Sequence, residues 1–238
     1  MEELIQYIFS TFNKEIDIDA KQFYQNAKLK LLEKDKYTVY VPPILFPEIE
    51  VDKSEYYELV EDAFEEWSNA LNRKIIFQKT TTTNSADILV YWVKSTRKNV
   101  GMQYKQNNKH CISIGLQDTS GNIYDYRYVY SIILHEIGHI LGLGHSPCEN
   151  DIMNAIVKSA GKISKNDRFV LNLIYDIGNN KTYQESKSII DKYISKQNKR
   201  EICNIKNQDL NEDLEMISML NKRNLFLQKE IKKYKFDN

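Results

Sequence analysis

SIILHEIGHILGLGHS, residues 131–146, contains three of the four histidines of this 238-residue chain. His135 and His139 are four residues apart, and an α-helix has about 3.6 residues per turn, so both imidazoles lie on one helix face. His145 follows six residues later. Neutral imidazoles are common ligands of Zn²⁺. The spacing therefore predicts a long helix that carries two ligands of a zinc site, with His145 as the third.

The residues around these histidines predict how the site is built. Gly142 and Gly144 tolerate positive φ angles, so the helix can end there and the chain can turn back with His145. Three protein ligands leave a position open for water, as in catalytic zinc sites, whereas structural zinc sites are usually closed by four. Glu136 follows the first ligand and is expected to lie beside the metal as the general base.

Two alternatives concern the same segment. The histidines could be ordinary core residues of an amphipathic helix, but their placement on the complete HExxHxxGxxH pattern argues against this interpretation. Cys148, three residues after His145, could close the zinc as a fourth ligand, or it could be a small loop cysteine.

The fourth histidine lies outside this segment. His110 has no acidic or histidine neighbour in the sequence and is interpreted as a surface histidine.

Glycine and proline divide the chain into three parts. Every glycine and proline falls between Pro42 and Gly178, which predicts a loop-rich middle and largely helical flanks. The predicted parts are an N-terminal helical extension, a catalytic domain and a charged helical C-terminal extension: 1–36, 37–178 and 179–238. Strands and helices are expected to alternate in the middle part. The strands are expected at 37–41, 74–78, 87–93, 100–104 and 111–116, and the helices after Asp52, over 124–141 and from Ser164 to Gly178. Asp167 is placed to form a capping box with Ser164 at the start of the last helix.

The flanks leave more than one interpretation open. Apolar residues recur at helical spacing near the N-terminus and over residues 18–35. Residues 1–36 are expected to form a helical extension, and the alternative is an inhibitory segment across the cleft. Residues 179–238 are expected to form a charged helical hairpin that could bind a protein partner, with a coiled coil as the alternative because no clean heptad persists.

Composition excludes several classes of function. The chain has 33 basic and 33 acidic residues, so nothing favours binding to nucleic acid or to an anionic membrane. Three cysteines form no disulfide framework. The N-terminus MEELIQYIFSTF lacks a basic leading region, and no run approaches about 20 apolar residues. These features predict a cytoplasmic protein without a transmembrane segment, with non-classical export as the alternative.

The sequence resembles the metzincin peptidases, and among them the matrixins. The resemblance rests on HEIGHILGLGHS, on Ser146 after the third histidine, and on Met153, which falls where the family has its Met-turn methionine. ADILVYWV (86–93) is similar to the third strand of the family, and ISKNDRFVLNLIYDIG (163–178) is similar to its closing helix.

The resemblance implies an α+β fold with a twisted, mostly parallel five-stranded sheet, an antiparallel edge strand and a long active-site helix. The edge strand, expected near Val100–Tyr104, would bind the substrate backbone. Residues 1–36 contain no cysteine, so they lack the propeptide switch of the animal enzymes. The segment that binds structural zinc and calcium is also missing, which predicts one catalytic zinc and no required calcium.

The function predicted from these features is zinc-dependent endopeptidase activity on protein or peptide substrates. Met153 is expected to form an apolar floor beneath the histidines. Two alternatives remain: a non-catalytic zinc protein, in which the metal only holds the fold, and an interaction protein dominated by its helical flanks.

Overall fold

The chain divides into two compact units, residues 1–195 and 196–238. The computed structural model describes residues 2–13, 27–47, 49, 52–95, 100–159 and 161–197, so nearly all described residues belong to the first unit. Its helices and strands are α1 Glu2–Phe12, β1 Lys36–Tyr40, α2 Lys53–Ala70, β2 Ile76–Lys79, β3 Ile88–Ser95, β4 Gly101–Gln106, β5 Lys109–Gln117, α3 Tyr126–Leu141, α4 Lys165–Ile177 and α5 Tyr183–Gln197.

The five strands form one sheet in the order β2-β1-β3-β5-β4. The first four strands in this order pair in parallel, and β4 pairs antiparallel with β5 at the edge. The α+β class, the mostly parallel sheet and the antiparallel edge strand are therefore confirmed. Each strand lies within about two residues of its expected position.

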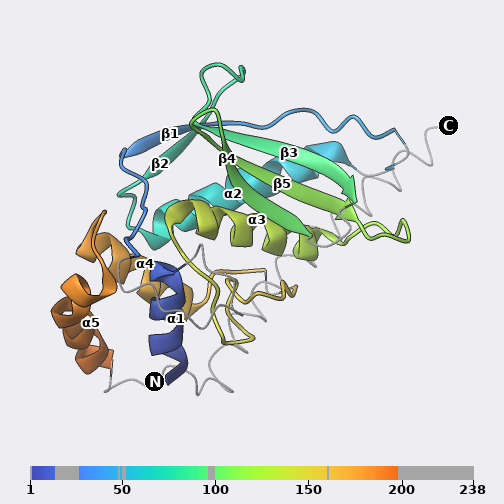
Figure 1. Ribbon diagram of the computed structural model, residues 1–238. Coiled ribbons are helices and arrows are strands. Elements are labelled where there is room, and N and C mark those ends of the chain that lie inside the picture. The colour runs from blue at the N-terminus through green and yellow to red at the C-terminus, as the bar shows by residue number, and fades with distance from the viewer. Residues whose placement is uncertain are drawn as a thin grey trace. The chain divides into compact units, whose positions relative to one another are not determined.

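Helices α2 and α3 pack together along the sheet, as Figure 1 shows. Residues on the shared faces are fully buried, including Trp67 on α2 and Ile132 on α3. The Trp67 indole also donates a hydrogen bond of 2.9 Å to the carbonyl of Leu134. This bond fixes the position of α2 relative to α3 along the helix axes. This packing places α3, the helix with the first two histidines, in the centre of the unit.

Side chains at the helix ends explain where the helices begin and stop. Asp52 accepts a hydrogen bond from the Ser54 amide at the start of α2. Asp125 does the same for the Tyr128 amide at the start of α3. The predicted capping box of Ser164 and Asp167 is present at the start of α4.

The expectation of a helix over residues 18–35 is wrong for its described part. Residues 27–35 form no helix, and Leu29 exchanges backbone hydrogen bonds with the loop after α4, donating to the Lys181 carbonyl and accepting from the Asn180 amide. Leu29 and Leu32 are buried in this conformation, so tertiary packing outweighs the helical spacing of the apolar residues.

The remaining predictions on the flanks have mixed outcomes. Helix α1 confirms the helical pattern of the first twelve residues, and α5 covers most of residues 179–197. Residues 14–26 and 198–238 lie outside the described residues. The inhibitory segment over 1–36 and the hairpin, coiled coil and partner binding over 179–238 include these residues and stay predictions. The described helices are all too short or too polar to cross a membrane.

Candidate metal centre

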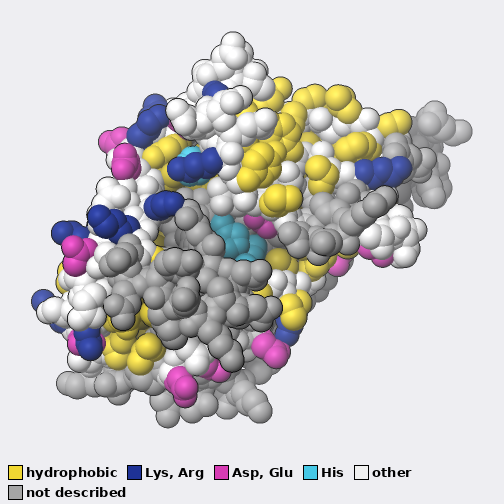
Figure 2. All heavy atoms as spheres, in the orientation of Figure 1, with side chains coloured by type: hydrophobic (Ala, Val, Ile, Leu, Met, Phe, Trp, Pro, Cys, Tyr) yellow, Lys and Arg dark blue, Asp and Glu magenta, His cyan; other side chains and the backbone are white. Residues whose placement is uncertain are grey.

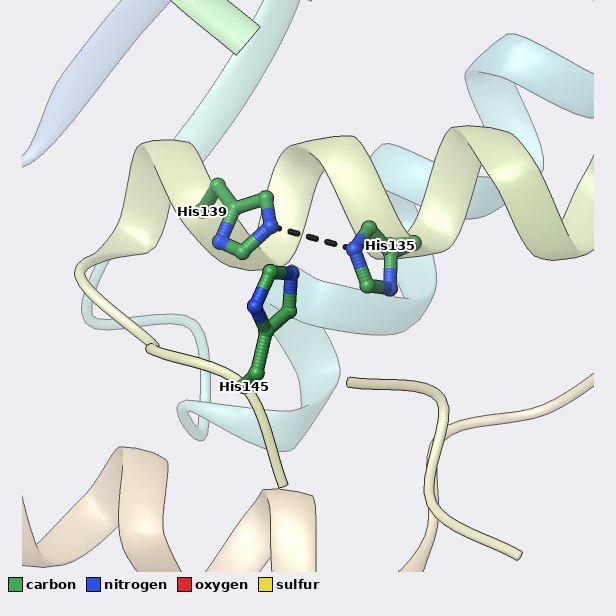
Figure 3. Close-up of side chains that lie close together, drawn as sticks. All are labelled: His135, His139 and His145. Atoms are coloured by element: carbon green, nitrogen blue, oxygen red, sulfur yellow. Dashed lines mark hydrogen bonds between the residues drawn. The ribbon is translucent and has the colours of Figure 1, made fainter. Parts of the chain in front are cut away.

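The three predicted histidines come together in space. One ring nitrogen of each lies within 4.8 Å of those of the other two, and this is the one such cluster of potential metal ligands in the described part of the chain. His135 and His139 point from successive turns of α3, and His145 approaches them from the loop that follows (Figure 3). In the space-filling view, histidine side chains are visible in a hollow of the surface with an acidic side chain beside them (Figure 2).

The turn after α3 brings His145 back toward the helix. Gly142 is the C-cap and has φ 113°, the left-handed conformation that glycine adopts without strain, as predicted. Gly144 is not among the residues with positive φ, so its predicted role is wrong. It is needed for space: a Cβ there would lie 2.5 Å from the carbonyl oxygen of Ser10 on α1.

The Nδ1 atoms of two histidines face backbone carbonyls. His135 Nδ1 lies 2.8 Å from the Ile152 oxygen, and His139 Nδ1 lies 3.0 Å from the Leu143 oxygen. A carbonyl oxygen only accepts, so Nδ1 carries the proton in both rings and each neutral ring has its lone pair on Nε2. Such partners commonly orient the histidine ligands of metals.

The two Nε2 atoms are 3.0 Å apart, the contact drawn dashed in Figure 3. Two lone pairs at this distance repel each other unless a cation or a shared proton lies between them. Ligands around a tetrahedral zinc at about 2.0–2.1 Å would be roughly 3.3 Å apart. The donor set and its protonation therefore fit a divalent metal such as Zn²⁺.

Met153 packs beneath this part of α3, where the resemblance to the matrixins places it. The side chain is fully buried, and a Cβ at Gly138 would overlap its sulfur atom. Trp67 approaches the same point of the helix, at 3.1 Å from that Cβ position. Gly138, between the two helical ligands, therefore provides the space that lets the methionine sulfur approach the helix backbone.

Glu136 faces the edge strand rather than solvent. A Cβ built on Gly101, the first residue of β4, would lie 2.6 Å from Glu136 Oε1 and 2.7 Å from the Ile132 side chain. The glycine thus permits the backbone of the edge strand to pack directly on the carboxylate. Because Gly101 and Glu136 are 35 positions apart and Gly101 has no sequence motif of its own, the sequence analysis missed this contact.

Burial shifts the pKa values of these groups. Desolvation raises the pKa of Glu136 to about 8. Desolvation lowers the pKa of His135 to about 4, with a smaller contribution from the nearby His145, and lowers the pKa of His145 as well. His135 and His145 are therefore held neutral, which is the form that binds a metal, whereas a cation close to Glu136 would favour its charged form.

A second group of polar residues connects the loop of His145 to the Met153 turn. Ser146 donates a hydrogen bond of 2.5 Å from its hydroxyl to Asp151, and its amide donates to the Met153 carbonyl at 2.7 Å. Asp167 on α4 accepts a hydrogen bond of 2.8 Å from the Ile152 amide. The sequence analysis identified Asp167 only as a capping residue and did not identify Asp151. Cys148 is not part of the ligand cluster.

The structure combines a mixed sheet with an antiparallel edge strand, a central helix bearing two histidines and a third histidine from the following loop. This is the arrangement that the resemblance to the metzincins implies. The sequence profile of the matrixin family matches residues 103–176, about a third of the chain, which includes all three histidines, Glu136 and Met153. This part of the chain is accordingly similar to the matrixin metallopeptidases. No curated protein matches the sequence.

Proposed function

We propose that the protein is a zinc-dependent endopeptidase in which His135, His139 and His145 hold one catalytic zinc and Glu136 is the general base. The observation that carries this proposal is the convergence of three imidazoles within 4.8 Å, next to a buried carboxylate that faces the edge of the sheet. A purely structural metal site has no need of a desolvated carboxylate at this position, because burying it without a partner costs free energy.

Zinc bound to the three imidazoles would supply a Lewis acid that polarises the scissile carbonyl and acidifies a water molecule. Glu136 would accept a proton from the attacking water and then deliver it to the leaving amine. The hydrogen bonds of His135 and His139 to backbone carbonyls would keep their rings oriented throughout the reaction. Met153 would support the helix turn between them without taking part in proton transfer.

The substrate would bind along β4. This strand pairs with β5 on one side and has no strand partner on the other among the described residues, so an extended peptide can add to it through backbone hydrogen bonds. Met102 on β4 is 49% exposed, and this apolar side chain would contact the peptide. Since Gly101 of the same strand touches Glu136, a peptide on this edge would lie beside the general base.

Replacing Glu136 by glutamine tests the proposal directly. The amide has nearly the same shape but cannot accept the proton, so we expect a loss of about 10²–10⁴-fold in kcat on quenched fluorescent peptides, with zinc still bound at one ion per chain. Glu149→Gln is the control, since the Glu149 side chain is 77% exposed and lies on the loop near the site. A Glu136→Gln protein that cleaves at the wild-type rate would refute the assignment. Wild-type protein that binds zinc but cleaves no peptide would favour the non-catalytic alternative.

A further inference from the structure

Helix α1 contacts the loop that carries His145 through polar groups. The Gly144 amide donates a hydrogen bond of 3.1 Å to the Thr11 hydroxyl. The Ser10 hydroxyl lies 2.5 Å from the His145 carbonyl and 2.8 Å from the Tyr7 carbonyl of its own helix, and its one proton is shared between these two acceptors. The Gly144 amide precedes the His145 Cα atom in the chain, and the His145 carbonyl follows it. The Ser10 backbone also lies directly against Gly144, where a Cβ would collide with it.

The same helix reaches the other side of the site. The Tyr7 hydroxyl donates a hydrogen bond of 2.8 Å to Asp167, and the second oxygen of this carboxylate accepts from the Ile152 amide at 2.8 Å. The Ile152 carbonyl is in turn the partner of His135 Nδ1. All four of these groups are buried, so the connection from α1 to the first ligand is shielded from water.

The third ligand depends on such contacts more than the first two. His135 and His139 are held by the backbone of α3, whereas residues 143–145 have no regular secondary structure. The position of the His145 ring therefore follows from whatever fixes the peptide groups around it. In the described residues, Ser10 binds the His145 carbonyl and Thr11 binds the Gly144 amide, both from α1, while the Ser146 amide on the far side of the same peptide group donates to the Met153 carbonyl.

We propose that α1 is a positioning element of the metal site, in which Ser10 and Thr11 fix the His145 loop and thereby set the affinity for the metal. The apolar residues of α1 hold it on the protein, since Leu4, Ile8 and Phe12 are buried. The packing of these apolar residues does not depend on the Ser10 and Thr11 hydroxyls, whose hydrogen bonds act on the His145 loop. This inference rests on the metal site of the proposed function.

The test replaces both hydroxyl residues and measures metal binding. In the full chain, Ser10→Ala combined with Thr11→Val removes the two hydrogen bonds to the loop and keeps the size of the Thr11 side chain. The zinc dissociation constant is measured by competition with a chromogenic chelator. We expect affinity to fall by about 10-fold or more, as for partners that orient metal ligands elsewhere. The visible absorption of the Co²⁺-substituted protein should change as well, because it reports the ligand geometry.

Two controls separate positioning from general stability. Ser68→Ala removes a buried hydroxyl that donates to the Ile75 carbonyl at 2.7 Å, at the end of α2, so it should lower the melting temperature without changing zinc affinity. Thr11→Ser keeps the acceptor for the Gly144 amide and should retain most of the wild-type affinity. If the double variant fails to fold, Thr11→Val alone is compared with Thr11→Ser by the same measurements.

The outcomes distinguish this inference from the proposed function. Wild-type zinc affinity and Co²⁺ absorption in the hydroxyl-free variants would overturn it, as would an equal loss of affinity in Ser68→Ala. Wild-type protein that binds zinc tightly but hydrolyses no peptide would reject the endopeptidase, while a selective loss in the double variant would still support the role of α1. A wild-type chain that binds no zinc would overturn both.

Discussion

Substituting Gly101 by alanine should impair catalysis while leaving metal binding intact. The new Cβ would lie 2.6 Å from Glu136 Oε1, 2.7 Å from the Ile132 Cγ2 atom and 2.9 Å from Glu136 Cγ. Ordinary carbon contacts are about 3.5–4.0 Å, so the groups must separate by roughly 1 Å. Ile132 is fully buried and β4 is fixed by its register with β5, so the Glu136 side chain is the part that can move.

The expected size of the effect follows from this displacement. A misplacement of about 1 Å at a reacting group can cost roughly 10²-fold in rate, which is about 2.7 kcal/mol in activation free energy. The added methyl group should also lower the free energy of unfolding by about 1–3 kcal/mol, as overpacked positions do. We therefore expect kcat on a quenched fluorescent peptide to fall about 100-fold, with zinc still bound at one ion per chain.

The assay needs a control on the same strand. Met102→Ala shortens an exposed side chain of β4 and does not touch Glu136 in the described contacts, so it should affect KM more than kcat. A Gly101→Ala protein with kcat within about threefold of wild type would show that β4 does not constrain the carboxylate. A variant that lost its zinc would equally refute the reasoning, because no described contact links Gly101 to the histidines.

Three further results are expected. Gly138→Ala should destabilise the protein by about 1–3 kcal/mol in thermal or urea unfolding and weaken zinc binding, because the methyl group would overlap the Met153 sulfur; unchanged stability would contradict that packing. Removal of zinc by a chelator should lower the melting temperature and abolish peptide hydrolysis, and added zinc should restore both; hydrolysis that survives chelation would exclude a metal mechanism. Burial and the nearby Asp151 raise the pKa of Asp167 to about 6, above its unfolded value near 4. Between these two pH values the Asp167 carboxyl is protonated in the folded state and ionised in the unfolded state. The stability of the zinc-free wild type relative to Asp167→Asn should thus decrease as pH rises from about 4 to 6, and a pH-independent difference would contradict the shift.

The sequence predicted those parts of the site that depend on local spacing. His135 and His139 share a helix face because they are four residues apart, and Gly142 ends that helix because it can adopt φ 113°. Ser164 and Asp167 cap α4 because the two side chains reach each other's backbone within one turn. Interactions within a few residues follow from backbone geometry, which every sequence shares.

The sequence did not predict contacts between distant segments. Ser10 meets His145 across 135 positions, and no residue pattern in either segment indicates the pairing. Residues 27–35 have helical spacing but form no helix, because the Leu29 backbone bonds to the loop after α4 instead. Both outcomes depend on which distant segments pack against each other after folding. The residue pattern within a short stretch of sequence does not indicate those contacts.

The glycines show that residue type alone does not predict the structural role of a position. The sequence analysis treated them as turn residues, and Gly142 fits this interpretation. Gly101, Gly138 and Gly144 lack positive φ and instead leave space for a carboxylate, a methionine sulfur and a helix backbone.

These three contacts act on different parts of the site: the general base, the two helical ligands and the third ligand. If each contact positions its own group, Gly101→Ala should reduce kcat alone, whereas Gly138→Ala and Gly144→Ala should weaken zinc binding. Equal effects of all three substitutions on zinc affinity and kcat would show that the site responds only to the stability of the fold.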